Sequence, residues 1–203
     1  LIQLDAQKQN AIVLFGGGNV EITKEEIDET LTHFSLGDML VLQNEIVHTG
    51  YLIEQAKRKG MSVCLNTAPF DEKILALPLE KVDVLVLNEI EGAALAKTNT
   101  GSSFTQVLEA LVSAYPHSEI VLTVGKGGVY YGYQEIRLYE PIYDIPVVDT
   151  TAAGDTFVGY FLTARSLGYG VQDSLRLSCK ASGLAVSRSG AMQSIPLKSE
   201  VFD

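Results

Sequence analysis

A run of small residues between two acids, Asp149–Asp155, carries the clearest chemistry in this sequence. The apolar pair Val147-Val148 precedes it and a helical pattern follows it, which indicates a turn from a strand into a helix. Small side chains let a ligand approach the backbone, and the first amides of a helix are unpaired and carry a partial positive charge. The turn therefore predicts an anion site, most naturally for phosphate.

The acid that closes this run, Asp155, adds a second chemical function. A carboxylate beside a phosphate site can orient a hydroxyl group and accept its proton during phosphoryl transfer. The alternative is that Asp155 only caps the helix. The length and order of the whole run favour the catalytic interpretation over the capping one.

Another strand end is followed by Asn88-Glu89-Ile90-Glu91. Asn88 and Glu91 lie one helical turn apart and so share a face. An amide and a carboxylate aimed at a phosphate site suit a hydrated Mg²⁺, which prefers oxygen ligands and keeps its waters. We expect Glu91 to orient magnesium through water and Asn88 to contact the phosphates. The alternative is a pair of polar residues that only begin a helix.

These motifs sit in an alternation of apolar strands and amphipathic helices. Such a pattern predicts a single α/β domain, a three-layer αβα sandwich whose mainly parallel sheet is covered on both faces. Ligands then bind beyond the carboxyl ends of the strands. We predict strands at 11–15, 39–42, 62–65, 82–87, 119–124, 129–133, 136–139 and 146–148. We predict helices at 24–34, 49–59, 88–97, 104–114, 156–167 and 173–186, with Thr23 and Glu26 as a capping box and Gly60 as a stop.

The run Asp149–Phe157 resembles the second signature of the ribokinase-like, or PfkB-type, carbohydrate kinases, Asp-Thr-x-[Gly/Ala]-Ala-Gly-Asp. The resemblance extends from about Asn10 to Pro196 and implies the ribokinase-like fold, which has a Rossmann-like topology. It implies that Asp155 is the catalytic base and contacts the substrate. It also implies an anion hole made by the amides of Ala152, Ala153 and Gly154.

The same resemblance assigns residues for the nucleotide and the sugar. Thr123–Gly128 is similar to the family motif Thr-x-Gly-x-x-Gly, with Lys126 next to a position where relatives often carry a basic residue. Glu45, in Gln43-Asn44-Glu45, resembles a glutamate that binds sugar hydroxyls, and Asn66 matches an Asn-x-Ala-Pro turn. The nucleotide-binding residues implied are Asn88, Thr123, Gly125, Gly128 and Gly154.

A loop near the C-terminus, 185–194, resembles a family loop that helps to bind a monovalent cation. Oxygen-only coordination suits K⁺, and the ion could order the neighbouring anion hole. Lys180 departs from the small or amide residue of relatives, so it is either a nucleotide contact or a surface charge. The residues implied for the cation are Asp149, Thr151, Ala185, Arg188, Gly190 and Ser194.

The resemblance implies ATP-dependent phosphorylation of a sugar primary hydroxyl, with Mg²⁺ and K⁺ as cofactors. D-ribose, giving ribose 5-phosphate, is favoured by Gln43-Asn44-Glu45, by Ala152 and by the loop at 187–194. The alternatives are another kinase of this family, for fructose or a nucleoside, and a nucleotide-binding fragment without catalysis. A Rossmann-type dehydrogenase is disfavoured because Gly16-Gly17-Gly18 lacks the G-x-G-x-x-G spacing.

Composition limits the partners of this chain of 203 residues, which has a formal net charge of −10. That charge disfavours nucleic acid and anionic membranes, and the apolar runs are too short to cross a bilayer. With only Cys64 and Cys179 we expect buried, reduced thiols and a cytoplasmic or also nuclear protein.

The chain lacks an initial Met and lacks the early sugar-binding motifs and the β-lid of relatives. We therefore expect residues 1–203 to be one partial kinase domain that carries the nucleotide-binding half. Such a domain would expose an apolar edge and have weak or no activity alone. The full-length protein could form a homodimer through the lid.

Overall fold

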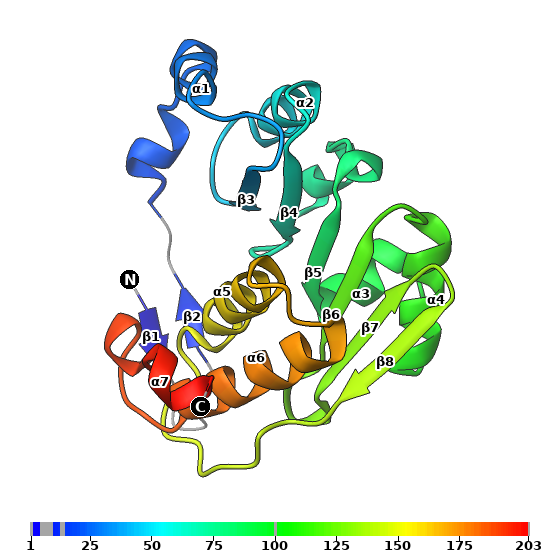
Figure 1. The fold of residues 1–203 in the computed structure, drawn as a ribbon, viewed down its shortest axis with the longest axis vertical. Helices are drawn as coiled ribbons and strands as arrows, with labels where there is room; N and C mark the ends of the chain where they lie inside the picture. The colour runs from blue at the N-terminus through cyan, green and yellow to red at the C-terminus, as the bar shows by residue number, and fades with distance from the viewer. Residues whose placement is uncertain (1, 5–9, 13–14, 100, 203) are drawn as a thin grey trace.

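The computed structural model describes residues 2–4, 10–12, 15–99 and 101–202, and its main feature is a six-stranded sheet with the order β3-β4-β5-β6-β7-β8 (Figure 1). β3 to β6 are parallel, whereas β7 and β8 continue from β6 as an antiparallel hairpin. The mainly parallel sheet and its hairpin confirm the prediction. The strands are β3 (Met39–Gln43), β4 (Ser62–Asn66), β5 (Val84–Asn88), β6 (Glu119–Thr123), β7 (Val129–Tyr133) and β8 (Ile136–Glu140).

Helices cover both faces of this sheet, so the predicted three-layer sandwich is confirmed (Figure 1). Side chains alternate along the strands, and in β5 Leu85 and Leu87 face one core while Val84 and Val86 face the other. Helices α1 to α4 pack in the first core, and α5 and α6 pack in the second. The helices are α1 (Lys24–Leu31), α2 (Thr49–Arg58), α3 (Glu89–Ala96), α4 (Phe104–Ala114), α5 (Ala153–Ser166), α6 (Val171–Val186) and α7 (Lys198–Val201).

The predicted capping box of α1 and the predicted glycine stop after α2 are both present. The Glu26 amide donates to Thr23 Oγ1 at 3.2 Å, and the Thr23 amide donates to Glu26 Oε2 at 2.8 Å, which completes the capping box of α1. Gly60 follows α2 with a φ of +76°, a conformation that glycine adopts without steric cost. No helix among residues 2–4, 10–12, 15–99 and 101–202 has the length and apolar character needed to span a membrane.

The strand predicted at 146–148 is wrong, because this part of the chain lies along α6 and outside the sheet. The amides of Val148 and Asp149 both donate to the Val186 carbonyl, at 2.8 and 3.1 Å. Pro146 has no amide to offer to a strand ladder. The extended stretch from Pro141 therefore connects β8 to α5 and separates two cavities described below.

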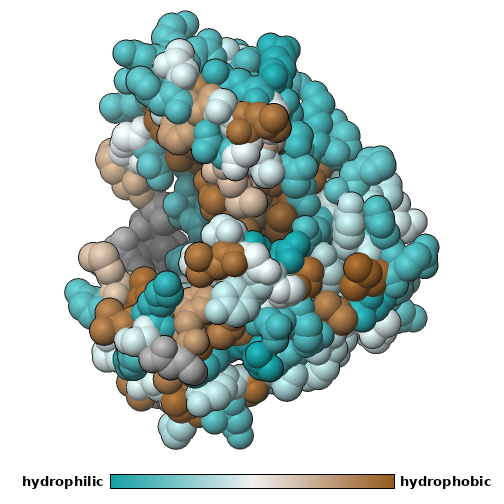
Figure 2. All heavy atoms as spheres, in the orientation of Figure 1, coloured by the Kyte–Doolittle hydropathy of each residue, from teal (hydrophilic) through white to brown (hydrophobic). Residues whose placement is uncertain are grey.

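One of the two edge strands, β3, differs from the buried strand that was predicted at 39–42. Met39 and Val41 are 43% and 50% exposed, because β3 stands at the end of the sheet order. The expected exposed apolar edge is therefore present, and Figure 2 shows apolar side chains gathered over the β3 and β4 region.

The strand predicted at 11–15 is only partly within the described residues. Its first two residues belong to β2 (Asn10–Ile12), which pairs antiparallel with β1 (Ile2–Leu4) in a separate two-stranded sheet. Residues 13–14 lie outside the described residues, and Phe15 is exposed and outside a strand.

Candidate active site

The N-terminus of α5 is open to a ligand. The helix starts at Ala153, three residues before the predicted start, after Ala152 in a left-handed conformation with φ +60°. Its first i to i−4 bond is donated by Thr156 to the Ala152 carbonyl at 2.9 Å, so the amides of Gly154 and Asp155 precede the helical ladder. Ala152 provides no side-chain cap, and a β-carbon on Gly154 would meet no heavy atom within 4 Å.

This geometry is what the predicted anion hole requires. The dipole of a 14-residue helix adds a partial positive charge at the same place. Of the three amides assigned to the hole, that of Ala153 already donates to the Thr150 carbonyl at 3.3 Å. The amide of Gly154 is therefore better placed for an anion than that of Ala153.

The predicted base, Asp155, lies in the first turn of α5 with its side chain exposed. Gln43 Nε2 donates to Asp155 Oδ1 at 2.7 Å, so the carboxyl end of β3 meets the start of α5. Glu45, the residue assigned to the sugar, follows two positions later in an exposed turn. The resemblance pointed to Glu45 and missed Gln43. The signal for Gln43 was its place directly after the predicted strand at 39–42, and in the structure it is the last residue of β3.

The turn after β4 is held beside the turn after β3. Asn44 donates from its backbone amide to the Ala68 carbonyl at 3.0 Å and from Nδ2 to the Pro69 carbonyl at 2.9 Å. Asn66 is 9% exposed, and its Oδ1 accepts the Ala68 amide at 3.3 Å. The predicted Asn-x-Ala-Pro turn is thus hydrogen-bonded to Asn44 and holds the backbone between Gln43 and Glu45 in place.

A cavity of about 400 Å³ opens next to the start of α5. Apolar side chains such as Phe157 and Val147 form much of its wall, and Ser182 and Gly183 of α6 close one side. Ala153 of the anion hole also faces it. All five residues assigned to the nucleotide line this one cavity: Asn88, Thr123, Gly125, Gly128 and Gly154.

The turn between β6 and β7 requires glycine at Gly128. Its φ is +87°, and a β-carbon there would lie 2.3 Å from the Glu140 carbonyl oxygen. No side chain fits at that distance, so this glycine lets the turn approach the end of β8. Thr123 Oγ1 donates to the Leu87 carbonyl at 3.2 Å, which ties the same turn to β5.

Asn88 and Glu91 form a capping box at the start of α3. Asn88 Oδ1 accepts the amides of Ile90 and Glu91 at 2.9 and 3.0 Å. Glu91 is 5% exposed, and its Oε2 accepts the Asn88 amide at 3.0 Å and Thr67 Oγ1 at 2.9 Å. These contacts are the ones expected if Asn88 and Glu91 only begin a helix. Asn88 also reaches the cavity, whereas the magnesium role of Glu91 stays a prediction that requires an intervening water.

The predicted cation residues are brought together chiefly by Asp149. Its Oδ1 accepts the Thr151 amide at 2.9 Å, and its Oδ2 accepts the Gly190 amide at 3.0 Å, so one carboxylate joins two distant segments. The Ala185 carbonyl accepts the Arg188 amide at 3.1 Å. Oxygen atoms make up this donor set, which suits K⁺.

The side chains of two other residues assigned to the cation, Ser194 and Arg188, bind other protein groups. Ser194 is buried and its hydroxyl donates to the Ala191 carbonyl at 2.6 Å, while the Arg188 guanidinium pairs with Glu200. Within the described part of the chain, His, Cys, Asp and Glu side chains form no group of three that could hold a metal ion.

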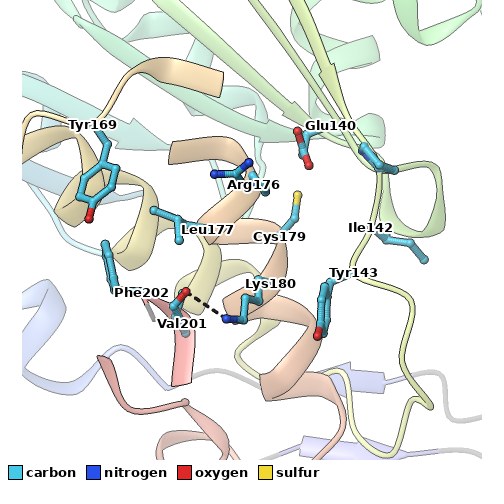
Figure 3. A pocket seen from close by; sticks show the side chains of 11 residues that line it. Glu140, Ile142, Tyr143, Tyr169, Arg176, Leu177, Cys179, Lys180, Val201 and Phe202 are labelled. Carbon is cyan, nitrogen blue, oxygen red and sulfur yellow. Dashed lines mark hydrogen bonds between the residues drawn. The ribbon is translucent and has the colours of Figure 1, made fainter. Parts of the chain in front are cut away.

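A second cavity, of about 550 Å³, lies beyond Tyr143 and shares Ile142, Tyr143 and Cys179 with the first (Figure 3). Lys180 lines this second cavity and not the first, and its Nζ donates to the Val201 carbonyl at 3.2 Å. Of the two alternatives for Lys180, a nucleotide contact or a surface charge, the nucleotide contact has no support from its position.

Each charged side chain of the second cavity has a protein partner. Arg176 pairs with Asp173 at 2.7 Å, and Glu140 accepts from Gln172 at 2.5 Å. Cys179, between the cavities, is a poor nucleophile because burial raises the pKa of its thiol to about 12.

A mainly parallel α/β sandwich with an open helix start and an acid in that first turn is an arrangement suited to phosphoryl transfer. The chain belongs to the pfkB family of carbohydrate kinases, since the family model described as "pfkB family carbohydrate kinase" matches residues 1–198. This confirms the predicted family and the predicted class, phosphotransferases that act on a sugar hydroxyl.

Curated relatives agree with this assignment. The chain is 32% identical over 208 residues to ribokinase from Staphylococcus aureus (strain COL), covering 98% of the chain and 67% of the relative. It is 28% identical over 208 residues to ribokinase from Haemophilus influenzae, covering 100% of the chain and 67% of the relative. The chain thus spans about two thirds of the length of these relatives.

Solved structures show the same fold. Ribokinase from Thermotoga maritima matches with a TM-score of 0.81 at 33% identity, over 99% of this chain and 67% of that one. Arabidopsis thaliana ribokinase, solved in complex with ribose and ATP, matches with a TM-score of 0.84 at 26% identity, over 99% and 66%.

Proposed function

We propose that this protein transfers the γ-phosphoryl group of ATP to the primary hydroxyl of a pentose, with D-ribose as the substrate and ribose 5-phosphate as the product. The open N-terminus of α5, with Asp155 in its first turn and a cavity beside it, carries the proposal. The relative solved with ribose and ATP supports the choice of both substrates.

In this proposal the nucleotide lies in the 400 Å³ cavity, with its base against the apolar wall and its phosphates toward α5. The amide of Gly154 faces the group in transfer, and the helix dipole adds to its effect. Fixed donors of this kind stabilise the charge that spreads over the phosphoryl oxygens during transfer.

Asp155 takes the proton from the attacking hydroxyl. Its carboxylate lies where β3 meets the start of α5, which supports a sugar position between Gln43 or Glu45 and the anion hole. The hydroxyl oxygen forms the new bond to phosphorus as the bond to the ADP oxygen breaks. The proton ends on the Asp155 carboxyl group.

Two cations fit the residues present. Mg²⁺, which binds mainly through phosphate oxygens and water, would supply charge neutralisation next to Asn88 and, through water, Glu91. K⁺ would be held by oxygens of Asp149, Thr151, Ala185, Arg188, Gly190 and Ser194 and would supply charge that orders the turn before α5. The residues around Asp149 meet the requirement because its carboxylate already joins the two segments.

The test is ADP release by the purified protein with ribose, fructose or adenosine, with K⁺ or with a non-coordinating organic cation. Ribose with K⁺ should give the highest rate. Asp155→Asn should lower turnover by at least about 10²-fold while ATP affinity stays nearly unchanged. Asp173→Asn is a matched control, since Asp173 lies in the first turn of α6 but lines neither cavity.

Each other outcome has a definite meaning. A faster reaction with fructose or adenosine would assign another activity of the family. Binding of ATP without sugar-dependent ADP release would make this chain a nucleotide-binding fragment. An active Asp155→Asn variant would remove Asp155 as the base.

A further inference from the structure

One hydrogen bond at the candidate active site joins the proposed base to a residue far away in the sequence. Gln43 and Asp155 are 112 positions apart in the chain, and Gln43 Nε2 donates to Asp155 Oδ1 at 2.7 Å. Among the described residues this is the one hydrogen bond that reaches the Asp155 carboxylate. Gln43 is half-buried and closes β3, where it pairs in parallel register with Asn66.

An exposed aspartate at a helix start has several staggered rotamers available. A hydrogen bond from a neutral donor to a carboxylate is charge-assisted and stronger than one between neutral groups, so this contact selects one of those rotamers. The selected rotamer turns the Asp155 carboxylate toward the end of β3. It occupies Oδ1 and leaves Oδ2 for another donor.

We propose that Gln43 is a positioning residue, which holds the Asp155 carboxylate so that Oδ2 can accept the proton of the sugar hydroxyl. This inference rests on the proposed function. It assigns Gln43 to the orientation of the base, and it leaves binding of ATP to the cavity beside α5, which Gln43 does not line.

The side-chain chemistry of Gln43 suits this task. Its amide can donate without losing a proton, so it does not compete for the site that must receive the hydroxyl proton. Its anchor is rigid, because β3 is hydrogen-bonded to β4 up to its last residue and the following Asn44 is bonded to Ala68 and Pro69. A base held from a sheet strand is better fixed than one held from a loop.

Three substitutions separate the properties of Gln43. Gln43→Met keeps the length of the side chain and removes the donor. Gln43→Asn keeps the donor and shortens the side chain by one methylene, so it no longer reaches Oδ1 from the same backbone. Gln43→Glu keeps the shape and sets a second carboxylate against Asp155, so it should be the most harmful of the three.

Misplacement of a catalytic group by about 1 Å can cost up to about 10²-fold in rate. We expect kcat to fall about 10-fold in Gln43→Met and Gln43→Asn and further in Gln43→Glu. KM for ATP and the affinity for a non-hydrolysable ATP analogue should stay within about 2-fold, because the cavity is unchanged. A merely structural role would instead change stability and ATP binding together with kcat.

The matched control is Gln55→Met, at a half-buried glutamine on α2 that lines neither cavity. It should leave kcat and both KM values unchanged. A second measurement does not depend on turnover: the side-chain amide resonances of Gln43 in the NMR spectrum of the ligand-free protein. Asp155→Asn should shift them, and Asp173→Asn should not.

The outcomes are distinguishable. An active wild-type protein in which Gln43→Met keeps its full kcat overturns this inference and leaves the proposed function intact. Amide resonances of Gln43 that ignore Asp155→Asn overturn it as well, whatever the activity. A wild-type protein without phosphoryl transfer overturns the proposed function and, with it, this role of Gln43.

Discussion

Helix propensity and packing predict opposite effects on stability for one substitution, Gly183→Ala, in the last turn of α6. Alanine is more favourable than glycine inside a helix by about 1 kcal/mol, so propensity alone predicts that Gly183→Ala stabilises the protein. In the structure a β-carbon at Gly183 would lie 2.9 Å from both the β-carbon and the carbonyl oxygen of Tyr143. Real β-carbons essentially never stand that close to other heavy atoms, so something must move.

One of these atoms is the backbone carbonyl oxygen of Tyr143, and the other is its β-carbon, which is bonded directly to the backbone. Neither can swing aside as the end of a long side chain would. Overpacking of this kind costs about 1–3 kcal/mol. Subtracting the propensity gain leaves a net loss of roughly 0–2 kcal/mol in the free energy of unfolding for Gly183→Ala.

A matched control is available in the neighbouring helix. Gly159 lies in the interior of α5, is exposed, and would place a β-carbon with no heavy atom within 4 Å. Gly159→Ala should therefore show the propensity gain alone, about 1 kcal/mol of added stability. The two variants should differ by about 1–3 kcal/mol, with the same substitution in the same type of element.

Urea unfolding of the wild type and both variants measures this difference. Gly183 and Tyr143 both line the proposed nucleotide cavity, so Gly183→Ala should also weaken ATP binding, while Gly159→Ala should not. Equal stabilisation by the two substitutions, with ATP affinity unchanged in both, would refute the reasoning. It would show that the stretch containing Tyr143 moves away from α6 at no cost.

Three further predictions follow from buried groups. Thr156 Oγ1 is a buried polar atom without a hydrogen-bond partner among the described residues, so Thr156→Val should raise the free energy of unfolding by about 1 kcal/mol in urea. Burial raises the pKa of the Cys64 and Cys179 thiols to about 12, so both should react slowly with iodoacetamide at pH 8, and ATP should slow Cys179 further because that residue lines the cavity. Burial, and then the carboxylate of Glu119, raises the pKa of Tyr131 above its usual value of 10, so the stability it contributes is complete below pH 10 and is lost as the pH rises beyond that. Tyr131→Phe should therefore reduce the fall in stability measured by denaturation between pH 10 and 11.

Most of the fold could be predicted because its elements follow simple periodic rules. Buried parallel strands such as β5 are near-continuous apolar runs, and helix ends such as those of α1 and α2 carry a capping box or a glycine. Each of these signals depends on residues close together in the chain. The nucleotide assignments also came together in one cavity, since strand ends in a parallel sheet share an edge.

The errors occurred where the deciding contact lies far away in the sequence. The pattern at 146–148 is that of a strand, but the amides of Val148 and Asp149 find the Val186 carbonyl at the end of α6. Exposure of Met39 and Val41 depends on which strand is outermost, which no local pattern states. The contact of Gln43 with Asp155 joins two segments whose proximity only the assembled sheet and helix reveal.

The charge of the protein and the charge of its proposed substrate are of the same sign, yet they are compatible. A net charge of −10 repels ATP at long range, but salt screens exposed charges beyond about 8–10 Å. At the cavity itself the charged lining residues are one acid, Glu89, and one base, Lys126, which offset one another.

The attraction for an anion then comes from the fixed dipoles of the α5 amides and from any cation that accompanies the phosphates. Because backbone amides carry no titratable charge, affinity that depends on them should vary less with pH than affinity built from lysine or histidine. The overall charge of this chain therefore says little about the anion it can hold, and the local backbone at Ala152–Asp155 says a great deal.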